Sequence, residues 1–337
     1  MHKWECQDLG EQKEFLQMHI TCKGHTIHLD QCAYLQKVIE CCSMLNAKSA
    51  STPLPPGYYA AKNTEPIDAE LYSHFQMVIG PLLYLMLGTR PDIAFAVTHL
   101  LCHSANPSQD HLNKVLYICH YLIGMSTYSL VYNGGSGTGL TTCTDSDWGS
   151  DPTSCLSQTG FYLKLADGLI SWTSHVQKTI AYSSTEAEYM ALSNCTCQVT
   201  WIQSLLGELG YKLNAILICN NQGSIFMASN SIMEPCSKHI DICYHGIHES
   251  IAMVKLNYSS SMVLKTLLIY SPGTYHMRSL QSSKFNWAYN FLLVALSTLF
   301  AEVLYVQHSK GECWSHMCTW HNTSTECAQV CGTFNHM

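Results

Sequence analysis

The chain has 337 residues, of which 47% are hydrophobic and only 12% are charged, and its formal net charge is −7. This charge argues against a globally basic nucleic-acid-binding protein. The 18 cysteines of so long a chain do not fit a small disulfide-bonded secreted domain, so reduced thiols and an intracellular location are expected.

The first part of the chain is predicted to be mostly helical. Its predicted elements are two strands and four helices, in the order 15–21, 26–29, 31–42, 72–87, 91–104 and 109–123. The Pro- and Gly-rich segment 52–57 interrupts this pattern and indicates a linker. Pro91 stands at a position suited to the first turn of a helix.

A second boundary at Gly134-Gly135-Ser136-Gly137 precedes a different pattern. Ser183 and Glu186 have the spacing of a capping box, which predicts the start of a long helix. The predicted elements are strands at 140–145, 160–165 and 169–173, a helix at 183–207, a strand at 215–219, and helices at 222–229 and 240–254. This order predicts an α/β fold with a mixed sheet and flanking helices.

From about residue 257 the segments lose clear boundaries, and 257–337 is expected to be a divergent tail. The stretch 285–306 is nearly long enough to span a bilayer, but Asn290 and Glu302 interrupt it, so no membrane association is expected. The tail cysteines lack the tight paired spacing of common zinc modules, so no zinc site is expected either.

Several short strings carry a resemblance to a known family. They are Asp8-Leu9-Gly10, Ser51-Thr52-Pro53-Leu54, Gly88-Thr89-Arg90-Pro91-Asp92-Ile93-Ala94, Tyr121-Leu122, Ile170-Ser171-Trp172, the segment 183–192, and Lys238-His239-Ile240-Asp241. In this order and spacing, the chain from about residue 5 to 254 resembles the Pol polyprotein of Ty1/copia-type retrotransposons.

The resemblance implies four segments. Residues 1–57 would be the end of the reverse transcriptase and 58–133 a helical connection, followed by a ribonuclease H-like domain at 138–256 and the tail at 257–337. The polymerase's paired catalytic aspartates lie upstream of the matched region in this family, so no polymerase activity is expected.

The resemblance also implies a carboxylate site that holds a pair of Mg²⁺ ions, with Mn²⁺ as a possible substitute. Its four catalytic positions would be Asp145, Glu188, Asn220 and Asp241, and the metal ligands Asp145, Glu188 and Asp241. Asn220 stands where the family has an aspartate, and its amide removes one negative charge from a site that must neutralise two dications. Weak metal binding and weak or absent hydrolysis are therefore expected. The competing interpretations are a solvated strand-end aspartate, a surface glutamate, and an Asp241 that complements a helix dipole.

Arginine is scarce: the chain has two arginines, Arg90 and Arg278, beside 18 cysteines and 18 histidines. Cys155, His120 and His248 occupy positions that are basic in the family. Neither side chain reproduces the bidentate phosphate contact of arginine. Lys178 and Lys238 are the expected remaining phosphate contacts.

The predicted ligand is an RNA–DNA hybrid, and other Pol products are further possible partners. Arg-to-Cys, Arg-to-His and Asp-to-Asn changes each follow from single transitions, which favours a degenerate copy of the element. Two alternatives stay open: a still-active Mg²⁺-dependent ribonuclease H, and a non-catalytic interaction module.

Overall fold

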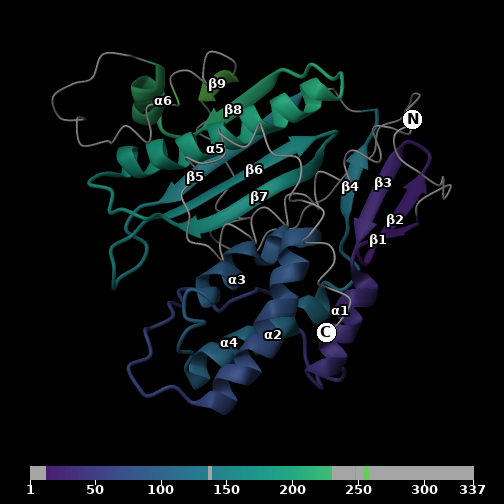
Figure 1. Cartoon of the computed structure of the whole chain (residues 1–337), viewed down its shortest axis with the longest axis vertical. Coiled ribbons are helices and arrows are strands. Elements are labelled where there is room, and N and C mark those ends of the chain that lie inside the picture. The colour runs from purple at the N-terminus through teal and green to yellow at the C-terminus, as the bar shows by residue number, and fades with distance from the viewer. Residues whose placement is uncertain (1–12, 136–138, 230–246, 248–253, 259–337) are drawn as a thin grey trace, which may run out of the picture. The chain divides into compact units, whose positions relative to one another are not determined.

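A computed structural model describes residues 13–135, 139–229, 247 and 254–258 (Figure 1). The chain divides into two compact units, Met1–Ala301 and Glu302–Met337, and every described residue belongs to the first. The predicted site residues Lys238 and Asp241 and the predicted tail, except for 257–258, lie outside the described residues.

The N-terminal part contains a four-stranded antiparallel sheet with the order β1-β2-β3-β4. Its strands are β1 (Glu14–Phe15), β2 (Met18–Lys23), β3 (Thr26–Asp30) and β4 (Leu130–Asn133). Strand β3 confirms the second predicted strand. The first, predicted at 15–21, is divided by a turn at Leu16 and Gln17, both with positive φ, so that β2 begins at Met18. Strands β2 and β3 are joined by a tight turn in which Gly24 has a φ of +59°, a conformation that favours glycine. Strand β4 was not predicted, and it pairs with β3 across about a hundred residues of chain.

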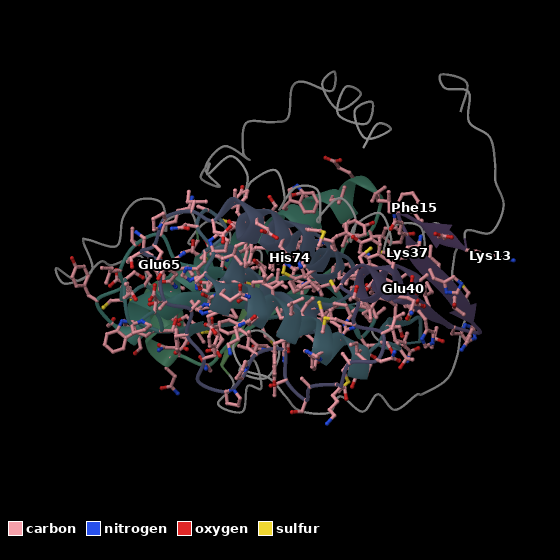
Figure 2. All side chains as sticks on the ribbon, turned by 90° about the horizontal axis from the view of Figure 1, so that it is seen from below. Lys13, Phe15, Lys37, Glu40, Glu65 and His74 are labelled. Atoms are coloured by element: carbon pink, nitrogen blue, oxygen red, sulfur yellow. The ribbon has the colours of Figure 1, made fainter. Side chains whose placement is uncertain are left out.

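Four α-helices accompany this sheet: α1 (Cys32–Cys41), α2 (Ala69–Gly88), α3 (Ala94–Leu101) and α4 (Gln109–Gly124). They confirm the predicted helices, although the predicted 91–104 helix begins as a 3-10 turn (Pro91–Ile93) and ends at Leu101. Helix α1 buries Leu35, Val38 and Ile39, whereas Lys37 and Glu40 point outward (Figure 2). The descent of this part from a reverse transcriptase stays a prediction.

Helix α2 begins at Asp68, whose carboxylate accepts hydrogen bonds from the amides of Glu70 and Leu71. Among the described helices, α2 alone has the length and apolar composition that a membrane span requires. Its Phe75, Ile79 and Leu82 are buried in the fold.

The C-terminal part is built on a five-stranded mixed sheet with the order β7-β6-β5-β8-β9. The strands are β5 (Leu140–Asp147), β6 (Gln158–Leu165), β7 (Gly168–Val176), β8 (Ala215–Cys219) and β9 (Val254–Tyr258). Strands β5, β6 and β7 are antiparallel neighbours, whereas β8 runs parallel to both β5 and β9. The predicted α/β fold with a mixed sheet is confirmed.

Two helices belong to this sheet, α5 (Ser184–Glu208) and α6 (Gln222–Ser229). Helix α5 packs along β5 and β6 (Figure 1) and buries a continuous apolar face that includes Leu192, Val199 and Ile202. The predicted helix at 240–254 is wrong at its end, because Val254 begins strand β9. Apart from Ile247, the rest of that segment lies outside the described residues.

Helix α2 and strand β4 of the N-terminal part contact strand β7 of the five-stranded sheet. The indole of Trp172 on β7 donates a hydrogen bond of 2.9 Å to the carbonyl of Met86 on α2. The hydroxyl of Tyr132 on β4 donates to the carbonyl of Leu169 at 2.7 Å. A Cβ at Gly168 would lie 2.7 Å from the carbonyl oxygen of Val131, so this close approach of β4 to β7 requires glycine.

Candidate functional site

Three chain segments converge at one edge of the five-stranded sheet. Strands β5 and β7 point the same way because each is antiparallel to β6, and β8 is parallel to β5. The carboxyl ends of β5 and β8 and the start of α5, which follows β7, therefore lie at the same edge. Asp145 comes near the end of β5, Glu188 in the second turn of α5, and Asn220 directly after β8.

Helix α5 packs on β5 through Thr142 and Cys195. The hydroxyl of Thr142 donates to the carbonyl of Tyr162 and lies 3.1 Å from the sulfur of Cys195. Glu188 and Asp145 both raise the pKa of the Cys219 thiol at the end of β8, so both lie near that strand end. Both side chains are buried, with exposed fractions of 6% and 3%.

Asn220 is hydrogen-bonded directly to Asp145. Its Nδ2 donates to Oδ1 of Asp145 at 3.1 Å, across the parallel pairing of Thr144 with Cys219. The Oδ1 atom of Asn220 is buried and has no hydrogen-bond partner among the described residues. The amide thus places a donor against the carboxylate at the position where the family has a further acidic ligand.

The two carboxylates also act on the buried thiol of Cys219. Burial raises the pKa of this thiol above its ordinary value, and the nearby charges of Glu188 and Asp145 raise it further. Cys219 has hydrogen-bond contacts with Ser224 and the amide of Asn221, so it completes the turn into α6. The edge is therefore a buried, negatively charged position.

The described donors do not fit a pair of divalent ions. Two carboxylates supply two negative charges against four positive ones, and the nitrogen of Asn220 faces the carboxylate that a cation would need. Within the described part of the chain, no group of three or more His, Cys, Asp or Glu side chains is placed to hold a metal ion. The fourth predicted position, Asp241, lies outside that part.

The loop before α5 is fixed against the end of β5. The indole Nε1 of Trp148, which follows β5 directly, donates to the carbonyl of Ala181 at 2.9 Å. Ser183 caps α5 by accepting the amide of Glu186, as predicted. The other half of the predicted capping box is displaced by one residue, because Glu186 accepts the amide of Tyr182 at 2.8 Å.

The structure describes four of the six predicted site residues. Asp145, Glu188 and Asn220 are brought together, and Lys178 is exposed on the loop between β7 and α5. Trp148 was not among the predicted site residues, although it stands directly after Thr144-Asp145-Ser146-Asp147. A tryptophan directly after an acidic strand end was the available signal.

No family model matches the chain. Curated proteins are similar to the chain. One is the retrovirus-related Pol polyprotein from transposon TNT 1-94 of Nicotiana tabacum, with 34% identity over 256 residues. This alignment covers 74% of the present chain and 19% of that protein. The chain is 33% identical over 256 residues to the one from transposon RE1 of Arabidopsis thaliana, covering 74% of this chain and 17% of that protein. The chain thus spans less than a fifth of the length of these relatives.

Solved structures are also similar. One is the N-terminal RNase H domain of a Mycobacterium tuberculosis protein, with 10% identity, a TM-score of 0.28, and coverage of 38% of this chain and 87% of that chain. Another is a foamy viral protease-reverse transcriptase in complex with an RNA/DNA hybrid, with 11% identity, a TM-score of 0.41, and coverage of 80% and 32%. The family assignment comes from the sequence relatives and confirms the predicted resemblance: the chain belongs to the retrovirus-related Pol polyproteins of Ty1/copia-type transposons.

Proposed function

We propose that this chain is a piece of a copia-type Pol polyprotein whose ribonuclease H-like part binds RNA–DNA hybrids but hydrolyses the RNA strand weakly or not at all. The hydrogen bond from Asn220 Nδ2 to Asp145 Oδ1 supports this proposal most directly. A lone pair of Asp145 that is engaged by an amide hydrogen is not available to a cation.

Charge supports the same conclusion. Two-metal hydrolysis needs acidic ligands that offset both dications, one of which activates water while the other stabilises the leaving oxygen. With an amide in place of a carboxylate, the site has lost one of these charges.

The test is cleavage of a labelled RNA–DNA hybrid in Mg²⁺, and separately in Mn²⁺, by the full chain and two variants. Asn220→Asp restores the acidic side chain. Asn221→Asp adds the same charge one residue away, where the side chain accepts the amide of Ser224 at the start of α6. The Asn220→Asp variant should cleave at least about 100-fold faster than the wild type, a difference of about 2.7 kcal/mol in the barrier.

Asn221→Asp should leave the rate unchanged. Equal rates for the wild type and Asn220→Asp, well above background, would favour a still-active ribonuclease H and contradict the proposal. If neither protein cleaves while both bind the hybrid, the loss of activity is not due to Asn220 alone.

A further inference from the structure

We propose that Trp148 and Tyr182 form an aromatic shelf that contacts the sugars of one strand of an RNA–DNA hybrid at the edge of the carboxylate site. This inference rests on the proposed function, because it names the surface through which the same site would hold its ligand. It concerns binding and is independent of whether hydrolysis survives.

Exposed apolar side chains gather at this edge. Trp148 is 53% exposed, Ile180 53% and Tyr182 78%. Trp148 Nε1 donates a hydrogen bond to the carbonyl of Ala181, which lies between Ile180 and Tyr182 in the chain, so the indole is next to both. Exposing large apolar groups to water is unfavourable, so a cluster of them beside a buried polar site indicates a contact surface.

The shelf is held in place before any ligand arrives. The indole of Trp148 is fixed through Ala181, and the backbone of Tyr182 is fixed by the carboxylate of Glu186 in the first turn of α5. A fixed indole at Trp148 and a fixed backbone at Tyr182 reduce the conformational entropy lost on binding, which favours their use as anchors.

The turn after β8 also reaches this edge. A Cβ at Gly223 would lie 2.9 Å from the side chain of Thr185, so the start of α6 packs closely on the start of α5. The segment that carries Asn220 therefore runs past the same loop that presents Tyr182. A strand lying across the carboxylates would pass the shelf.

The charges at this edge favour contacts with the sugars of a nucleic acid over contacts with its phosphates. Asp145 and Glu188 would repel phosphate groups, and Lys178 is the one lysine or arginine of the described loop 177–183. Arg90 is the sole arginine of the described residues, and it is buried. Aromatic rings pack on the apolar faces of sugars without requiring positive charge.

The test measures binding of a fluorescently labelled RNA–DNA hybrid to the full chain by anisotropy, without divalent cations, at 50 and 200 mM salt. Tyr182→Ala is the main variant, because removing so exposed a side chain should leave the fold intact. Tyr72→Ala on α2, also exposed, is the matched control. Trp148→Phe keeps a ring but removes the hydrogen bond to Ala181.

Tyr182→Ala should weaken binding about tenfold at both salt concentrations, because an apolar contact with the sugars releases no counterions. Lys178→Gln should weaken binding at 50 mM salt and much less at 200 mM. Trp148→Phe should retain most of the affinity, and Tyr72→Ala all of it.

Binding by Tyr182→Ala that equals the wild type would overturn the shelf while leaving the proposed function standing. A loss that disappears at 200 mM salt would also overturn it, since the contact would then be electrostatic. If the wild-type chain binds no hybrid at all, the proposed function fails together with the shelf. Preference for single-stranded RNA or DNA over the hybrid would keep the shelf and contradict the hybrid as ligand.

Discussion

Two buried charged positions in this molecule have opposite environments. In the N-terminal part, Arg90 donates from Nε and a terminal nitrogen to the carboxylate of Asp92 and from the other terminal nitrogen to the carbonyl of Met125. Its guanidinium also lies 5.9 Å from the ring centre of Tyr121. At the sheet edge, Asp145 accepts a hydrogen bond from the neutral amide of Asn220.

Arg90 is a charge that stabilises the fold, whereas Asp145 is a charge that the proposed function assigns to ligand binding. The partners of Arg90 lie within the chain, so the ion pair is complete in the isolated protein. At the sheet edge, the neutral amide of Asn220 donates to Asp145 without cancelling its charge, and the proposed function assigns this edge to a ligand. A chain that loses its ligand can keep the first kind of site and lose the second.

The ion pair of Arg90 should therefore be sensitive to truncation. Arg90→Met leaves Asp92 and the carbonyl of Met125 without their donors, and the free energy of unfolding should fall by about 3–5 kcal/mol in urea denaturation. Lys37→Met removes an exposed positive charge from α1 and should change it by no more than about 0.5 kcal/mol. Equal losses in the two variants would mean that the ion pair does not stabilise the fold.

Three histidines in the same part should make it sensitive to acid. His99 Nε2 accepts the amide of Ala60 and His111 Nδ1 accepts the amide of Ser108, while the rings of His103 and His111 stack at 4.4 Å. Burial lowers the pKa of all three, that of His103 to about 4, where the neighbouring histidines add to the effect and Asp151 opposes it.

Because the unfolded chain takes up these protons first, stability present at pH 7 should be lost as the pH falls from about 6.5 towards 4. The loss should be about 1–2 kcal/mol in urea titrations, after allowance for solvent screening. His103→Leu should flatten this dependence. An unchanged slope in that variant would assign the acid sensitivity to other groups.

The cap of α5 should have a smaller effect. Ser183→Ala removes the acceptor for the amide of Glu186, and the free energy of unfolding should fall by about 1 kcal/mol. The neighbouring Ser184→Ala, inside the helix, is the control and should have almost no effect. Thermal unfolding of both variants would show whether the cap anchors the helix that carries Glu188.

Local signals predicted most of the elements. Ser183 with Glu186 predicted the start of α5, and the alternation of Ile27 and Leu29 fits the observed burial on β3. Strand β4 was missed because its four residues become a strand only by pairing with β3 far away in the sequence. The same dependence on a distant partner, β8, explains why Val254 was assigned to a helix rather than to β9.

The site was predicted through resemblance, and its geometry was not. The sequence places Asp145, Glu188 and Asn220 at a strand end, in a helix and after another strand. Their convergence follows from the parallel pairing of β5 with β8, which is a property of the whole sheet. No local pattern could show that the amide of Asn220 would point at Asp145.

Thermal unfolding in a Mg²⁺ titration tests the central claim most directly. Without Mg²⁺, Asn220→Asp should be less stable than the wild type, because two carboxylates then face each other. With Mg²⁺, its unfolding temperature should rise steadily. At a Mg²⁺ concentration of a hundred times the dissociation constant, binding should stabilise the fold by about 2.7 kcal/mol. The wild type and Asn221→Asp should not respond, and a wild-type response as large as that of Asn220→Asp would contradict the account.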